Sequence, residues 1–225
     1  MIRCRLTGLS CGTVYGTAVR ADPGSPAMRI VITEFVSLDG VVQAPGGAEE
    51  DTDGGFAHGG WSGPYFDPEI VGGAWDSVLD KADALLYGRR TWQGMAAAWP
   101  RQKDDPFADR MNAIRKYVVS GTLGEADLTW NNSTLLAGDQ ALELIRELRA
   151  GQGRDLLVLG SPSLAQTLLA EGLADELKLI VMPVLLGGGK SLYPADGGKR
   201  PLELVSTTTS PAGVNVCTYR VLHQG

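Results

Sequence analysis

The stretch Ala82–Trp92 combines the residue types that bind a phosphate group. It reads ADALLYGRRTW, an apolar run followed by a glycine, two arginines and a threonine. The run predicts a buried strand, Gly88 lets the backbone approach a ligand, and a helix starting near Thr91 directs its free N–H groups at an anion. Four residues are therefore candidate phosphate ligands: Gly88, Arg89, Arg90 and Thr91. The alternative is an ordinary strand-to-helix turn, where glycine and arginine are common.

A second junction of the same kind occurs later in the chain. The apolar strand predicted at Asp155–Leu159 ends in Gly-Ser-Pro-Ser, and a helix is expected to follow as far as Ala170. Gly160, Ser161 and Ser163 are therefore candidate ligands as well. If both junctions meet in space, their helix N-termini grip one diphosphate from two sides.

Two better-known phosphate motifs do not fit the chain. Gly187-Gly188-Gly189-Lys190-Ser191 resembles the end of a P-loop, but the first glycine of that motif falls on Val184, and Pro194 blocks the helix that should follow. A flexible turn is the better interpretation of residues 187–191. No G-x-G-x-x-G follows the first predicted strand, so the dinucleotide fingerprint of doubly wound folds is also missing.

One carboxylate next to the first predicted strand is a candidate catalytic residue. Asp39, in the sequence Ser-Leu-Asp-Gly, is placed to orient a substrate or a water molecule. Asp-Gly in a turn has a sufficient backbone explanation, which is the alternative.

Composition narrows the class of protein. The chain has 225 residues, 44% of them hydrophobic and 20% charged, which predicts one well-cored soluble domain. A net charge of -6 argues against a nucleic-acid partner. Three cysteines without paired spacing favour a reducing compartment, and two histidines exclude a multi-histidine metal site. No apolar run is long enough to span a bilayer.

The first 27 residues differ from the rest of the chain. They show neither strand alternation nor helical periodicity and end in a Pro/Gly/Ser cluster. We interpret residues 1–27 as a disordered leader or a mis-assigned start, and residues 28–225 as the functional domain.

The remaining pattern predicts strands that alternate with helices and then strands alone. This order favours an α/β fold with a mixed sheet and an antiparallel C-terminal edge. Residues 43–64, rich in Gly, Asp, Glu and Pro, are expected to form a long loop of the kind that acts as a lid. Strands are expected at Met28–Leu38, Asp83–Tyr87, Lys116–Ser120, Asp155–Leu159, Leu177–Val184, Leu202–Thr209 and Val214–Leu222. Helices are expected at Asp67–Lys81, Pro106–Arg115 and Asp139–Ala150, the last with Asp139 as its cap. One further helix is expected to begin at Thr91, and another to follow Gly160 and end at Ala170.

These motifs, in this order, resemble the dihydrofolate reductase superfamily. The chain is most similar to the branch containing the reductase domain of bacterial riboflavin biosynthesis proteins (RibD C-terminal domain). The likeness covers residues 28–222. It rests on SLDG, ADALLYGRRTW, KYVVSGTL, LTWNN, LLVLGSPSLAQTLL and GLADELKLIVMPVLLGGGKSLYP.

The resemblance implies a three-layer fold around a central, mostly parallel eight-stranded sheet, NADPH as hydride donor, and a homodimer. It assigns the two junctions to the cofactor phosphates and places Ser120 and Thr122 near the adenosine ribose phosphate. The branch often has a basic residue between those two positions, and this chain has Gly121. The preference for NADPH over NADH is therefore open.

A second departure concerns the proton donor. Folate reductases have a carboxylate on the first helix, and the matching position here is Gly72. Glu69 and Asp76 lie about one turn to either side and are the candidate acids. The alternative is that both are solvated surface carboxylates.

The sequence therefore predicts a cytoplasmic NADPH-dependent reductase acting on a small heterocycle. The candidate reactions are reduction of 5-amino-6-(5-phosphoribosylamino)uracil in riboflavin biosynthesis and a dihydrofolate-reductase-like reaction. No zinc deaminase signature is present, so a role in riboflavin synthesis covers the reduction only. The alternative is a non-catalytic nucleotide-binding protein that keeps the fold.

Overall fold

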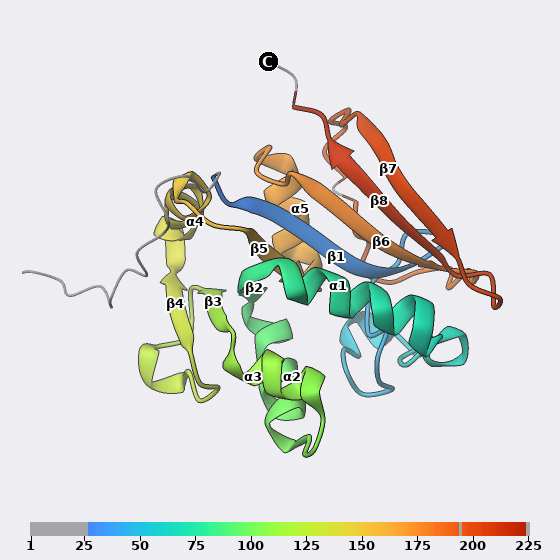
Figure 1. Ribbon diagram of the computed structural model, residues 1–225, viewed down its shortest axis with the longest axis horizontal. Coiled ribbons are helices and arrows are strands. Elements are labelled where there is room, and N and C mark those ends of the chain that lie inside the picture. Colours follow the sequence, from blue (N-terminus) through green and yellow to red (C-terminus); the bar gives the residue numbers. More distant parts are fainter. Residues whose placement is uncertain (1–26, 194, 224–225) are drawn as a thin grey trace, which may run out of the picture.

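The computed structural model describes residues 27–193 and 195–223, and the expectation for the leader lies almost entirely outside this range. Within these ranges a single eight-stranded sheet runs through the molecule in the order β4-β3-β2-β5-β1-β6-β8-β7 (Figure 1). The strands are β1 Arg29–Ser37, β2 Ala82–Gly88, β3 Arg115–Ser120, β4 Ser133–Ala137, β5 Asp155–Leu159, β6 Glu176–Met182, β7 Leu202–Thr209 and β8 Asn215–Val221.

The six strands from β4 to β6 are parallel, and β8 and β7 complete the sheet in antiparallel pairing. The predicted mixed sheet with an antiparallel C-terminal edge is thereby confirmed.

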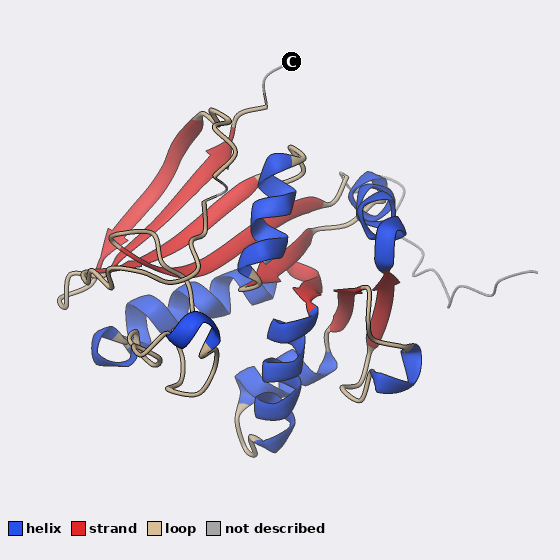
Figure 2. Ribbon diagram, turned by 180° about the vertical axis from the view of Figure 1, so that it is seen from behind, coloured by secondary structure: helices blue, strands red, loops and turns tan. Residues whose placement is uncertain are grey.

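Helices cover both faces of the sheet. They are α1 Gly73–Lys81, α2 Arg89–Ala98, α3 Pro106–Ala113, α4 Ala141–Ala150 and α5 Pro162–Ala170. Leu79, Trp92 and Met111 from α1, α2 and α3 pack in one core cluster, whereas Ile145 from α4 and Leu168 from α5 pack in another. In Figure 2, the view from behind, α5 lies in front of the sheet, on the face turned away in Figure 1. The result is the predicted three-layer arrangement.

Strand alternation decides which side chains belong to each layer. On β2, Ala84 and Leu86 pack toward α5, while Leu85 and Tyr87 pack toward α2. Every residue of β5 is buried, as expected for a central parallel strand covered on both faces.

Local signals explain most helix boundaries. The Asp67 side chain accepts hydrogen bonds from the backbone N–H groups of Glu69 and Ile70, at 2.9 and 2.8 Å, and so caps the π-helical turn that leads into α1. Two predicted starts were wrong. α2 begins at Arg89 rather than Thr91, and the residue before α4 is Gln140, because Asp139 lies in a preceding 3₁₀ turn.

A topological switch point lies on both sides of β5. The chain leaves β2 and β1 toward elements on the α1 and α2 face, whereas it leaves β5 into α5 on the opposite face. Ligands of open α/β sheets bind outside the carboxyl ends of strands at such points. The fold therefore directs attention to the ends of β2, β5 and β1.

None of the helices in the described ranges is both long and apolar enough to cross a membrane.

Candidate functional site

The two predicted phosphate junctions touch each other. The backbone N–H of Gly88, at the end of β2, donates a hydrogen bond of 2.9 Å to Oγ of Ser161, which precedes α5. The two residues are 73 positions apart, and the contact forms because β2 and β5 are neighbouring parallel strands. The starts of α2 and α5 therefore lie side by side at the carboxyl edge of the sheet.

Both helix starts lack a side-chain cap within the described residues. Ser161 occupies the cap position of α5, but its hydroxyl accepts from Gly88 instead of from its own helix. The first N–H groups of a helix have no intrahelical partner. Two sets of such donors meet here, which is the arrangement that an anionic diphosphate requires.

The backbone at the second junction is strained and close to the first helix. Gly160 and Ser161 both have left-handed φ angles, of 73° and 68°, and for serine this conformation is uncommon. A Cβ atom added to Gly160 would lie 3.1 Å from the methyl group of Thr91 on α2. Glycine is therefore needed both for the turn and for the approach of the two helix starts, and strain of this kind clusters at ligand sites.

The end of β3 extends the same edge. Val119 pairs with Gly88 across the β2–β3 ladder, so Ser120 and Thr122 follow directly beside the first junction. Ser120 is buried and its Oγ accepts from the backbone N–H groups of Thr122 and Leu123, at 3.1 and 3.0 Å. Gly121 between them is exposed.

The two arginines differ in their partners. Arg90 pairs with Asp53 from the long loop after β1, and Lys190 pairs with both Asp53 and Asp51. Arg89 makes no ion pair with any residue of the described ranges. A carboxylate of the loop is therefore paired with Arg90, one of the two arginines that were predicted to bind phosphate.

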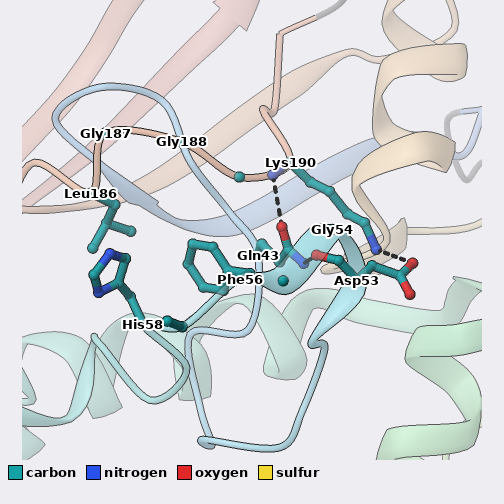
Figure 3. Close-up of a pocket in the computed structure, with 12 residues that line it drawn as sticks. Gln43, Asp53, Gly54, Phe56, His58, Leu186, Gly187, Gly188 and Lys190 are labelled. Carbon is teal, nitrogen blue, oxygen red and sulfur yellow. Dashed lines mark hydrogen bonds and ion pairs between the residues drawn. The ribbon is translucent and has the colours of Figure 1, made fainter.

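That loop also borders a pocket of about 540 Å³. Figure 3 shows Phe56 and His58 opposite Leu186, with the Lys190 side chain reaching Asp53. Oε1 of Gln43 accepts from the backbone N–H of Lys190 at 3.0 Å and so ties the loop to the glycine-rich segment after β6. Because Asp53 lines this pocket and also binds Arg90, the pocket adjoins the α2 junction.

Buried polar atoms without a partner mark the interior of the same region. Among the described residues, such atoms occur in Thr33, Glu34, Trp75 and Tyr87. Thr33 and Glu34 belong to β1 and Tyr87 to β2, the strands on either side of β5. Unpartnered buried polar groups are rare in native proteins, and a ligand that bonds them in the complex is one explanation.

The three candidate acids lie near the surface. Asp39 accepts from the Ser37 hydroxyl at 2.6 Å and from the backbone N–H groups of Leu186 and Gly187. The Ser37 hydrogen bond, followed by the one from Gly187, lowers the pKa of Asp39 to about 2. Asp39 thus fastens the turn after β1 to the segment after β6.

Glu69 and Asp76 have different surroundings. The Asp76 carboxylate is exposed and pairs with Arg110 of α3. Glu69 is exposed and lines a groove of about 250 Å³ between α1 and the β6–β8–β7 side of the sheet. Both remain predictions as proton donors, and neither lies among the unpartnered buried groups of β1 and β2.

No group of three histidine, cysteine, aspartate or glutamate side chains within the described ranges is arranged to hold a metal ion.

Comparison with known families identifies the fold around this site. The model of the RibD C-terminal domain matches residues 28–216. The chain belongs to this family. The predicted relationship is thereby confirmed, and the family and fold are those of reductases.

Individual relatives agree with the family. The chain is 29% identical over 196 residues to the uncharacterized protein YyaP of Bacillus subtilis (strain 168), covering 85% of this chain and 94% of YyaP. A solved protein from Shewanella sp. PV-4, named for riboflavin biosynthesis, superposes with a TM-score of 0.66 at 20% identity, covering 87% of this chain and 100% of that chain.

The fold extends to dihydrofolate reductase itself. The Enterococcus faecalis enzyme, solved with NADP(H), superposes with a TM-score of 0.54 at 14% identity over 86% of this chain and 96% of that chain. At this identity the likeness establishes the fold alone.

Sequence reasoning missed Glu34, Thr33, Tyr87 and Asp53. The signal for Glu34 was present, since a glutamate inside the strand RIVITEFVS contradicts the apolar pattern around it. Tyr87 and Thr33 resemble ordinary strand residues and gave no such signal. Asp53 lies in a loop, where no periodicity indicates a partner.

Proposed function

We propose that this protein is an NADPH-dependent reductase that transfers hydride to a pyrimidine-type or pterin-type heterocycle. The observation that carries the proposal is the contact between the two uncapped helix starts, Gly88 N–H to Ser161 Oγ at 2.9 Å. The reduction step of riboflavin biosynthesis and a dihydrofolate-reductase-like reaction are the candidate reactions.

The residues present fit a dinucleotide cofactor. The first-turn N–H groups of α2 and α5, with the hydroxyls of Thr91, Ser161 and Ser163, supply donors for a diphosphate. Gly160 lets Thr91 approach the second junction, because an added Cβ atom would lie 3.1 Å from the Thr91 methyl group. Arg89 adds a cation that is not engaged by a described carboxylate. When bound, the cofactor supplies the hydride.

The adenosine end is assigned to the edge after β3. Ser120 and Thr122 are proposed to lie near the ribose phosphate, and exposed Gly121 leaves room there. A phosphate bound by Arg90 competes with the Asp53 carboxylate for the same cation, so binding and loop position are expected to be coupled.

Substrate is proposed to enter where β1 and β5 separate. Thr33 and Tyr87 present unpartnered hydroxyl oxygens on the α1 and α2 face, where Phe35 and Trp75 stack with ring centroids 5.3 Å apart. Buried hydroxyls reject ligands that leave them unpaired, so the preferred substrate is a polar heterocycle.

The rival function is cofactor binding without catalysis. It is favoured by Gly72 at the position where folate reductases have their helix carboxylate, and by the pairing of Asp76 with Arg110. Titration with NADPH separates the two functions when combined with an assay of turnover.

The experiment measures NADPH affinity by calorimetry and NADPH oxidation with 5-amino-6-(5-phosphoribosylamino)uracil and with dihydrofolate. Replacing Arg89 and Arg90 together by alanine should weaken NADPH binding by about 1.5–3 kcal/mol for each charge-assisted hydrogen bond lost. Binding without oxidation would favour the rival function. A well-folded double variant with unchanged affinity would remove the arginines from the site.

We also propose that the protein works as a homodimer in the cytoplasm. All eight residues of the edge strand β7 are exposed, including Leu204 at 54% and Val205 at 50%. Exposed apolar edge strands invite pairing with another chain. Sedimentation of the wild type and of Val205→Lys tests this, since a dimer formed through β7 should become monomeric in the variant.

A further inference from the structure

The groove between α1 and the β6–β8–β7 side of the sheet, here called the α1 groove, is lined by polar groups. It has a volume of about 250 Å³ and shares no residue with the junction of α2 and α5. This volume is below the range of pockets for drug-sized ligands, so a ligand here must be small. Four of the lining residues carry hydroxyl groups and one carries a positive charge: Ser77, Ser206, Thr208, Thr218 and Lys178.

The sheet contributes three of these side chains as one row across its strands. Lys178 on β6 pairs with Thr218 on β8, and Thr218 pairs with Ser206 on β7. Directly paired residues of antiparallel strands place their side chains on the same face. An ammonium group and two hydroxyl groups therefore stand side by side at the floor of the α1 groove.

The charge of Lys178 is not balanced by the neighbouring row. The carboxylates of that row, Glu176 and Glu203, are each paired with an arginine. Lys178 forms no ion pair with a described residue, and its single hydrogen bond within the described ranges goes from Nζ to the Ala74 carbonyl oxygen at 3.4 Å. A half-buried charge with so little compensation is unfavourable, and an anionic ligand would supply the missing partner.

A second cation lies close to Lys178. Lys81 follows Ser77 by four positions, so the two residues lie on the same face of α1. Burial, and secondarily the charge of Lys81, lower the pKa of Lys178, while Glu176 has the opposite and weaker effect. Lys81 also has no ion pair with a described carboxylate. Two neighbouring like charges repel each other, and an anion bound between them removes this repulsion.

The opposite end of the α1 groove carries a hydrogen-bond acceptor. Glu69 lines the groove and lies about two helical turns before Ser77. The charges that shift the pKa of Lys178 are those of Lys81 and Glu176, and Glu69 is not among them. The Glu69 carboxylate therefore lies away from the two lysines, where it can accept hydrogen bonds from hydroxyl groups of a ligand.

We propose that the α1 groove binds a small phosphorylated polyol. The phosphate group lies between Lys178 and Lys81, because lysine binds phosphate as a point charge. The hydroxyls of Thr218 and Ser206 donate to its remaining oxygens, and the hydroxyl groups of the ligand extend toward Glu69. The site does not depend on the proposed reductase function. It also leaves the junction of α2 and α5 free, so both ligands can be bound together.

Calorimetry of the full chain with ribose 5-phosphate tests the site. Ribose 5-phosphate should bind, ribose should not, and inorganic phosphate should bind more weakly because it cannot reach Glu69. Lys178→Met should weaken binding of ribose 5-phosphate by about 10–100-fold, as expected for the loss of a charge-assisted hydrogen bond. Lys103→Met, at an exposed lysine outside the groove, is the matched control for net charge and should bind like the wild type.

Gly73→Leu closes the α1 groove without removing a charge. Gly73 is exposed and lines the groove, and a Cβ atom added there meets nothing within 4 Å. The variant should lose binding of ribose 5-phosphate but keep its thermal unfolding midpoint, because leucine favours a helix more than glycine does. Gly94→Leu is the matched control, since Gly94 is an exposed glycine of α2 whose added Cβ is equally free of contacts.

The same measurements distinguish the α1 groove from the cofactor junction. Replacement of Arg89 and Arg90 by alanine should leave binding of ribose 5-phosphate unchanged, and NADP⁺ should not displace it. Displacement by NADP⁺, or loss of binding in the double variant, would place the phosphate at the junction and overturn the inference. Failure of NADPH to bind would count against the reductase function and leave the α1 groove unaffected.

Three further results would contradict the proposal. The first is a wild type that does not bind ribose 5-phosphate, and the second is an equal loss of affinity in Lys178→Met and Lys103→Met. The third is unchanged binding in Gly73→Leu. Inorganic phosphate that binds as tightly as ribose 5-phosphate would indicate an adventitious ion only.

Discussion

Two ionisable side chains, Glu34 and Lys116, are buried in different surroundings. Lys116 is fully buried, but its Nζ donates to the carbonyl oxygens of Asn112, Ile114 and Asn131, at 3.0, 2.7 and 3.3 Å. These bonds fasten the end of α3, so Lys116 has a structural explanation. Glu34 Oε1 has no hydrogen-bond partner among the described residues, so its burial has no comparable structural explanation.

Burial raises the pKa of Glu34 well above its ordinary value of 4.5, which predicts how stability depends on pH. A pKa that is raised in the folded state gives stability that is present below the unfolded pKa and is lost as pH rises toward the folded value. The free energy of unfolding of the wild type should therefore fall relative to that of Glu34→Gln as pH increases above about 4.5. Urea unfolding at several pH values measures this. Parallel pH curves for the two proteins would show that Glu34 is ionised in the folded state.

Gly121 predicts the coenzyme preference. It is exposed, and a Cβ atom added there meets nothing within 4 Å, so a longer side chain fits without a clash. Gly121→Arg should strengthen NADPH binding by about 1.5–3 kcal/mol through a charge-assisted contact to the 2′-phosphate, while NADH binding changes little. Calorimetry with both coenzymes measures the difference. An equal gain for both would place the 2′-phosphate elsewhere.

Individual residues could be predicted where they interrupt an apolar strand or stand directly between a strand and a helix. Gly88, Gly160 and Ser161 follow apolar strands and precede helices, and the sequence sufficed to name them. Glu34 interrupts an apolar strand and was recognisable on the same grounds. The partners of Asp53 could not be foreseen, because loop residues carry no periodic signal.

At the scale of elements, the site depends on the contact between the starts of α2 and α5. Gly160→Ala should weaken NADPH binding, because the new Cβ approaches Thr91 and separates the two helices. Gly197→Ala is the matched control. Its φ of 71° is close to the 73° of Gly160, and nothing lies within 4 Å of its added Cβ. Both variants should lose about 1–3 kcal/mol of stability through backbone strain. Equal NADPH affinity in both would mean that the contact does not shape the site.

The loop after β1 is expected to oppose phosphate binding. Asp53→Asn removes the carboxylate that holds Arg90, whereas Asp51→Asn removes a partner of Lys190 and leaves Arg90 paired. Asp53→Asn should therefore tighten NADPH binding by about 0.2–1 kcal/mol, the range of an exposed ion pair, and Asp51→Asn should not. Weaker binding in Asp53→Asn would show that the loop supports the ligand instead.

Most strands and helices with clear periodicity were predicted to within two or three residues, and β5 and β7 matched at both ends. The helix expected at Asp67–Lys81 instead divides into a π-helical turn, Pro68–Gly72, and α1, Gly73–Lys81. The five-residue strand β4 was not recognised from its own pattern, because Ser133–Ala137 is short and only one of its residues is buried. Asp139 was expected to cap α4, yet a 3₁₀ turn intervenes. Short segments are decided by tertiary packing rather than by propensity.

At the scale of the whole molecule, strand order creates the site. The Gly88–Ser161 contact spans 73 residues, and only the placement of β2 beside β5 brings its partners together. Alternation of strands and helices predicted a mixed sheet, but it contains no information on which strands are neighbours. The family resemblance implied an eight-stranded, mostly parallel sheet with both junctions at one cofactor, but the strand order itself comes from the structure.

A crystal structure with NADP⁺ tests the central claim most directly. We expect the diphosphate between the first turns of α2 and α5, with its oxygens accepting from backbone N–H groups of both helices. A diphosphate bound elsewhere, for example in the pocket beside Phe56, with the Gly88–Ser161 junction free of ligand, would contradict the account.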